Sequence, residues 1–243
     1  MNVSRPLCLM IALIAAPAWC AKPPKIPDDA PYCAPPGAKP VFLSPMGEPF
    51  RGQPGQAYPA AAWFAAADAD HDGAISREEF LRDDQRFFKT IDLDHDGRVV
   101  PEEVIAYERD VAPEIALFST GARDYAEVVR RGGNKGGRSN YGGAMGAGRY
   151  AWLNVPQPVA SADSDFNRVI DADEFRQAAS RRFDTLAQGA GKLTLAAMPR
   201  TPFQIALEGP CRPRPKSKKG SDGERRDGQN DLDDRAQGEG PPR

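Results

Sequence analysis

Histidine is scarce in this chain, whose 243 residues include only His71 and His95. A zinc enzyme or a histidine-based hydrolase would therefore have very few residues to work with. The net charge of −2 gives no basic excess, so we expect no nucleic-acid partner. Neither a heptad pattern nor a strict glycine period is present, which excludes a coiled coil and a collagen helix.

Long hydrophobic runs are also missing. The apolar run Leu7–Ala16 is too short to span a bilayer as a helix. With Arg5 before it and small residues after it, this run predicts a secretory signal peptide over residues 1–20, with an uncleaved anchor as the alternative. Cys20 could carry a lipid, but the preceding Trp19 is bulkier than a lipidation site requires. We therefore expect a periplasmic or secreted chain with no transmembrane segment once the signal is removed.

Two cysteines, Cys33 and Cys211, remain after cleavage behind Cys20. They bracket the region that we expect to fold, in a compartment that permits disulfides. A bridge between them would close a loop of about 180 residues and add about 4–5 kcal/mol on the chain-entropy model. The sequence leaves open whether their geometry allows it.

Proline and glycine divide the chain into segments. Residues 21–57 are proline-rich without a helical period and predict an extended N-terminal arm. Residues 58–110 and 150–200 alternate short helical patterns with acidic loops. Between them, residues 111–149 combine a helical segment with a flexible glycine-rich insert. The tail, residues 212–243, has almost no apolar side chains and is expected to be disordered.

A twelve-residue acidic stretch begins at Asp68. It has carboxylates at positions 1, 3 and 5, glycine at position 6 and glutamate at position 12. Alternate residues of a chain wrapped around a hard cation point inward, and the glycine permits the sharp turn. The oxygen donors that we assign here are the side chains of Asp68, Asp70, Asp72, Ser76 and Glu79 and the backbone carbonyl of Ala74.

A second such stretch begins 24 positions later, at Asp92. Val100 occupies its position 9, so no side-chain oxygen can hold a water ligand there. The donors that we assign to this loop are Asp92, Asp94, Asp96 and Glu103 and the backbone carbonyl of Arg98.

A third stretch begins at Asp163 and has Arg168 where the other two have glycine. A side chain at that turn costs on the order of 1 kcal/mol or more, which predicts a weaker site. The donors that we assign to it are Asp163, Asp165, Asn167, Asp171 and Glu174 and the backbone carbonyl of Val169.

A fourth, degraded copy begins at Leu186 and keeps Gly191 but has no carboxylate. We expect it to bind no ion and to act as a structural partner. Because no such unit can bury its apolar face alone, we expect sequence neighbours to pair. The expected short β contacts are Ile75 with Val99 and Ile170 with Leu193.

These loops resemble those of the EF-hand superfamily, specifically the exported multi-hand proteins of bacteria. The resemblance covers residues 58–110 and 150–198. It implies an all-α fold of two pairs of helix–loop–helix units, with Ca²⁺ as the bound ion. Dockerin modules share closely spaced loops, but here each loop has an entering-helix pattern and glutamate at position 12. These two features favour EF-hands proper.

Three functional classes follow. In the first, calcium mainly stabilises the protein or is buffered by it outside the cytoplasm. In the second, a sensor or adaptor opens to bind a protein partner, yet only Met46, Met145 and Met198 remain for a methionine-rich groove. The third, an enzyme, is disfavoured because we find no nucleophile–base pair and assign no catalytic residue. His71 and His95 both fall at loop position 4, which points outward.

Overall fold

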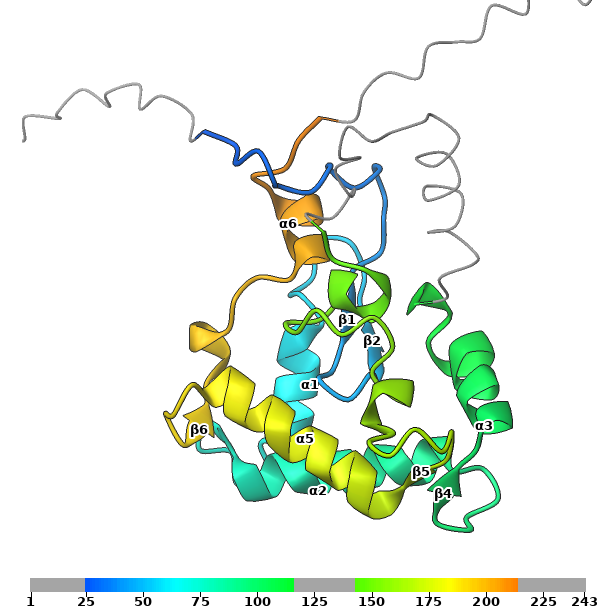
Figure 1. Ribbon diagram of the computed structural model, residues 1–243. Coiled ribbons are helices and arrows are strands. Elements are labelled where there is room, and N and C mark those ends of the chain that lie inside the picture. The colour runs from blue at the N-terminus through cyan, green and yellow to red at the C-terminus, as the bar shows by residue number, and fades with distance from the viewer. Residues whose placement is uncertain (1–24, 116–142, 214–243) are drawn as a thin grey trace, which may run out of the picture. The chain divides into compact units, whose positions relative to one another are not determined.

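Helices dominate the structure, a computed structural model that describes residues 25–115 and 143–213 (Figure 1). The predicted signal peptide, most of the predicted glycine-rich insert and nearly all of the tail lie outside these ranges. No helix in the described ranges is long and apolar enough to cross a bilayer. The helices are α1 (Ala60–Ala67), α2 (Arg77–Ile91), α3 (Pro101–Ala106), α5 (Ala172–Ala187) and α6 (Pro202–Glu208). The strands are β1 (Val41–Leu43), β2 (Pro49–Arg51), β3 (Ile75–Ser76), β4 (Arg98–Val99), β5 (Ile170–Asp171) and β6 (Lys192–Leu193).

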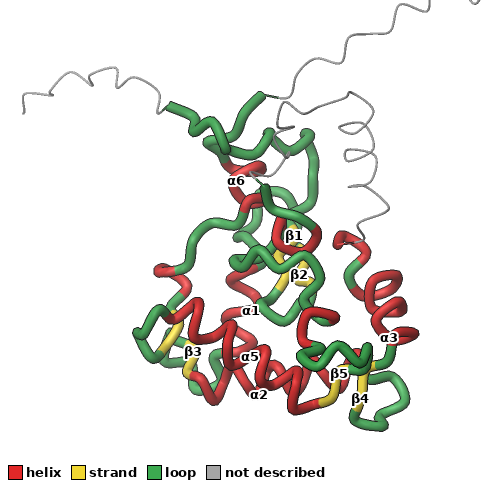
Figure 2. Tube along the Cα trace, in the orientation of Figure 1, coloured by secondary structure: helices red, strands yellow, loops and turns green. Residues whose placement is uncertain are grey.

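Helices α2 and α5 lie side by side, and each joins two of the loops (Figure 2). The Ser76 side chain caps the start of α2, where it accepts from the Glu79 backbone N–H while the Glu79 carboxylate accepts from the Ser76 N–H. Asp171 and Glu174 form the same reciprocal cap on α5. Such a cap satisfies backbone donors that a helix start leaves free. Each helix therefore begins at the end of an acidic loop and ends where the following loop starts.

The strand pairing differs from the predicted one. Strand β3 pairs with β6, so Ile75 lies opposite Leu193. Strand β4 pairs with β5, so Val99 lies opposite Ile170. The expected contacts within each sequence-adjacent pair are therefore wrong: the first loop pairs with the fourth and the second with the third. Since each pairing joins the start of one helix to the end of the other, α2 and α5 run antiparallel.

The segment expected to be an extended arm instead supplies a hairpin to the core. Strands β1 and β2 pair antiparallel, with Phe42 opposite Phe50. Phe42 is fully buried, with its ring centroid 5.9 Å from that of Trp63 and 4.8 Å from that of Trp152. Because proline is disfavoured in strands, the prolines around the hairpin argue against a β prediction for this segment of the sequence.

The outer helices are shorter than the sequence pattern suggested. The third loop has no full entering helix, because only the single 3₁₀ turn Ala160–Ala162 precedes it. The fourth loop leads into another such turn, Leu195–Ala197. Helix α3 continues as one turn of π-helix, Tyr107–Val111, and the Tyr107 hydroxyl donates to the buried carbonyl of Gly47 at 2.7 Å. The complete helix–loop–helix geometry is thus confined to the first two loops.

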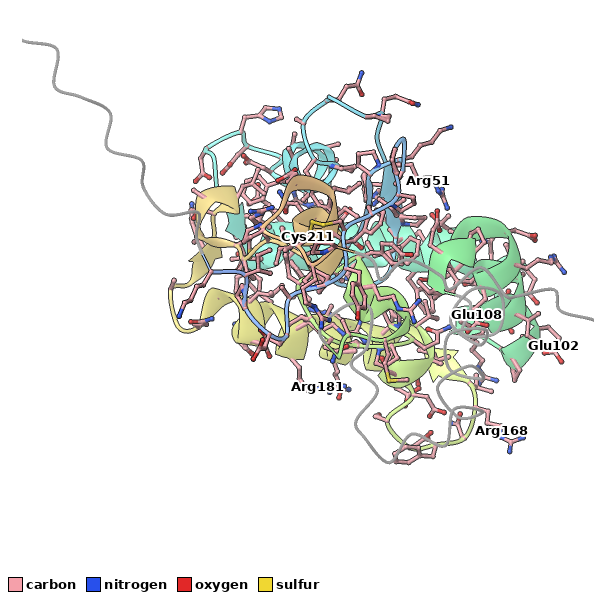
Figure 3. All side chains as sticks on the ribbon, turned by 90° about the horizontal axis from the view of Figure 1, so that it is seen from above. Arg51, Glu102, Glu108, Arg168, Arg181 and Cys211 are labelled. Carbon is pink, nitrogen blue, oxygen red and sulfur yellow. A yellow bond between two sulfur atoms is a disulfide. The ribbon has the colours of Figure 1, made fainter. Side chains whose placement is uncertain are left out.

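A disulfide joins the two ends of the folded region. Cys33 and Cys211 are bonded across a sequence separation of 178 residues (Figure 3). The same junction pairs Tyr32 with Arg212, whose guanidinium lies 4.4 Å from the centre of the Tyr32 ring. The bridge that the sequence left open is therefore present, and it fastens the first described residues to the chain that follows α6.

Two ionisable side chains are buried on the two central helices. Asp84 of α2 and Arg182 of α5 are only 2% and 7% exposed. The guanidinium donates to the carbonyls of Pro45 and Pro158, to Met46 Sδ and to Ser161 Oγ. By contrast, Asp84 Oδ1 has no hydrogen-bond partner among the described residues. Burial raises the pKa of Asp84 to about 7, against the opposing effect of the Arg182 charge.

We predict that Asp84→Asn stabilises the protein at pH 8 and changes little at pH 4. The pKa of about 7 lies above the ordinary 3.8, so folding favours the neutral carboxyl. The contribution of this group to stability is complete below about pH 4 and is lost as the pH rises through about 7. A shift of this size corresponds to roughly 4 kcal/mol.

Urea unfolding at pH 4, 6 and 8, with chelator present, measures the effect. Glu78→Gln is the control, because it removes an exposed carboxylate from the same helix. Parallel pH profiles for the wild type and Asp84→Asn would contradict the prediction.

Candidate calcium sites

The three acidic loops share one set of hydrogen bonds. The backbone N–H of position 6 donates to the carboxylate of position 1 at 3.0 Å from Gly73, 3.0 Å from Gly97 and 2.9 Å from Arg168. The N–H of position 5 donates to position 3, and the N–H of position 7 to position 5, in every loop. These bonds turn the carboxylates toward the inside of each loop. The structure therefore brings together the side chains predicted at positions 1, 3 and 5.

The glutamate at position 12 closes each loop. One oxygen of Glu79 accepts from the N–H of Ala69 at 2.9 Å, and the other accepts from the N–H of Ser76 at 2.8 Å. Glu103 and Glu174 make the equivalent two bonds, to positions 2 and 9 of their own loops. All three carboxylates are buried. Each glutamate thus joins the beginning of a loop to its exiting helix.

The same hydrogen bonds keep two of these glutamates ionised. The Ser76 N–H, opposed by burial, does most to lower the pKa of Glu79 to about 2. Burial opposes ionisation of Glu174, but the N–H and hydroxyl of Ser164 outweigh it and lower that pKa too. Both groups are carboxylates at neutral pH, which is the form that a hard cation binds.

The donor set fits calcium. In each of the three loops, one ligand atom from each of three acidic residues lies within 4.8 Å of the others. The groups are Asp68, Asp70 and Asp72; Asp92, Asp94 and Asp96; and Asp163, Asp165 and Glu174. Oδ1 of Asp92 and Oδ1 of Asp163 are buried without a hydrogen-bond partner among the described residues. A cation in the loop would satisfy these oxygens, as water or an N–H would elsewhere.

The fourth loop keeps the positive φ angles of positions 4 and 6, differs by a further positive φ of 47° at Gln188, and lacks the ligands of the other loops. Position 4 has a positive φ in all four loops: 58° at His71, 60° at His95, 62° at Phe166 and 86° at Gly189. Gly191, at position 6, has a φ of 77°. Leu186 replaces the first aspartate and is buried. This geometry agrees with the expected structural role.

His71 and His95 are exposed. Ser76 and Asp171, at position 9, cap their helices, so neither hydroxyl nor carboxylate is free of other contacts. Arg168 adopts a positive φ of 71°, and its side chain points away from the third loop (Figure 3).

The sequence analysis did not predict any contact between Lys192 and a ligand position. This residue of the fourth loop forms an ion pair with Asp72, a ligand position of the first loop. The repeat alignment gives Lys192 its place in the fourth loop, but only the observed pairing of the first and fourth loops brings the two side chains together.

Comparison with known families supports this assignment. The EF-hand family model matches residues 60–82 and 84–105, which contain the first two loops with their helices. The two matched segments are thus EF-hand units, a family that binds Ca²⁺, and their acidic loops could hold this ion. Comparisons with curated proteins and with solved structures give no significant match.

We predict that the second and third sites are coupled and that the first is independent of both. The ligand carbonyls of Arg98 and Val169 belong to the paired strands β4 and β5 or lie beside them, so an ion in one loop orders the other. Glu103→Gln should therefore weaken the third site and leave the first unchanged. Glu79→Gln, the matched variant in the other pair, should leave the third unchanged.

The amide resonances of Gly73 and Arg168 can follow the first and third loops during a calcium titration, since both amides bond to a ligand carboxylate. If Glu103→Gln weakened calcium binding by the first loop as well as by the third, the result would contradict the prediction that only the second and third sites are coupled.

We predict that Arg168→Gly tightens the third site. The change removes a positive charge beside the ligands and relieves a left-handed backbone that costs a non-glycine residue about 1–2 kcal/mol. Arg168→Gln, which removes only the charge, separates the two effects. Calorimetric titration measures both, and an isotherm unaltered by Arg168→Gly would mean that this loop does not bind calcium.

Proposed function

We propose that this is an exported protein whose calcium ions mainly stabilise its fold or are buffered by it, with two or three sites occupied. The observation that carries the proposal is that α2 and α5 are held at both ends by the loops and bury their aromatic faces in the core. Phe80 packs against Phe183 with ring centroids 5.5 Å apart, and Phe88 against Phe175 at 5.3 Å. Ions at the helix ends would reinforce this packing.

Export is supported by the covalent structure. A disulfide between Cys33 and Cys211 suits a chain that folds in an oxidising compartment. The proposed signal peptide precedes both cysteines, so the mature protein would be periplasmic or secreted. There calcium can be abundant, and the sites need not be tight.

A calcium-dependent sensor that binds a protein partner is the second candidate. Such proteins expose an apolar, methionine-rich groove on binding calcium. Here the Met46 side chain is 3% exposed, and its Sδ accepts a hydrogen bond from the Arg182 guanidinium, while Met145 is 50% exposed. The burial of Met46 favours the structural proposal. We propose no catalytic role, because the clustered carboxylates found in the described ranges belong to the calcium loops.

Calorimetric titration of calcium into chelator-stripped mature protein, with circular dichroism before and after, tests the proposal. We expect two or three binding events with a gain of helix, and one event fewer in Glu79→Gln. Unchanged stoichiometry in Glu79→Gln would refute the ligand assignment. Binding with little change in helix but new exposure of apolar surface to a dye would favour the sensor, and no binding would overturn both candidates.

A further inference from the structure

The first loop differs from the other two in what lies across its β contact. Its partner is the fourth loop, which has no carboxylate. Lys192 of β6 lies opposite Ser76 of β3 in the strand register. From there its ammonium group reaches back to Oδ2 of Asp72. A positive charge from a loop without ligands is thus placed on a ligand of the neighbouring loop.

This contact engages Oδ2 of Asp72, one of the two oxygens that this ligand position could offer to a cation. The other oxygen of Asp72, Oδ1, already accepts from the N–H of Ala74 at 2.9 Å. Calcium bound by Asp72 must therefore displace the Lys192 ammonium or share the carboxylate with it. In either case the divalent ion experiences a nearby positive charge that opposes its binding.

The second pair of loops lacks an equivalent contact. Arg98 occupies the same loop position as Lys192 and lies opposite Asp171 in the register of β4 and β5. Its side chain forms no ion pair with the residues that the structure describes. The ligand Asp96 accepts only the backbone N–H of Arg98, at 2.8 Å. Within residues 25–115 and 143–213, such an ion pair with a ligand carboxylate is therefore found at the first loop alone.

Contacts between α2 and α5 hold the fourth loop beside the first. Arg77, the first residue of α2, donates to Ser180 Oγ at 3.0 Å and pairs with Asp184, both of α5. Its guanidinium also lies 4.6 Å from the centre of the Phe183 ring. Helix α5 leads directly into the fourth loop, so these contacts fix Lys192 relative to the first loop.

We propose that Lys192 is an internal counterion that lowers the calcium affinity of the first loop. The inference rests on the proposed function, since it assumes that the first loop binds calcium. It gives the fourth loop a regulatory role in addition to its structural one: the loop without ligands sets the affinity of its partner. The first site is then weaker and more dependent on salt than its ligands alone would make it.

The test uses the mature chain with Glu103→Gln and Glu174→Gln, so that only the first loop titrates. In this background, Lys192→Gln should tighten calcium binding by roughly three- to tenfold in dilute buffer, as expected for one charge near a divalent ion in water. The gain should shrink in 1 M KCl, where screening is nearly complete. Lys192→Arg keeps the charge and should retain an affinity close to that of the unsubstituted background.

Arg181→Gln is the control, because it changes the net charge equally at an exposed position on α5. An affinity unchanged by Lys192→Gln would overturn the inference, as would equal effects of Lys192→Gln and Lys192→Arg or of Lys192→Gln and Arg181→Gln. Failure of the first loop to bind calcium in any of these proteins would overturn the proposed function as well, so the two failures are distinguishable.

Discussion

The antiparallel packing of α2 against α5 is the constraint on which the calcium loops depend. Helix α2 has 15 residues and α5 has 16, so each is roughly 22–24 Å long. Each helix leaves one loop and enters another, and the packing therefore places loops in pairs at both ends. The aromatic side chains between the helices fix their separation. Displacing either helix would separate both β contacts at once.

The features that the sequence could predict are those set by hydrogen bonds between near neighbours in the chain. The ligand positions are local: a carboxylate at position 1, 3 or 5 is oriented by an N–H two to five residues away, so the twelve-residue pattern is enough to place it. The capping pairs of Ser76 with Glu79 and Asp171 with Glu174 are equally local. The hairpin at Phe42 and the outer 3₁₀ turns depend on packing against distant segments, which no local pattern reveals.

The loop pairing predicted from the sequence was wrong, and the spacing of the loops along the chain gives the physical reason. Starts at Asp68 and Asp92 leave only about twelve residues between the two loops, enough for one helix but not for two. That helix must serve both loops and so holds them at its opposite ends. Ile75 and Val99 could not meet across it. The same argument separates Ile170 from Leu193, so each loop must find its partner on the other helix.

The resulting arrangement is unequal at its two ends. One end joins two loops with ligands, and the other joins the first loop to a copy that keeps the turn at Gly191 but has Leu186 in place of aspartate. This copy has the positive φ values and the β contact of the other loops without their ligands. The buried Asp84 lies near the middle of α2, and the buried Arg182 lies in the second half of α5. Ions in the loops would thus lie at helix ends, while aromatic packing and the hydrogen bonds of one guanidinium hold the helices between those ends.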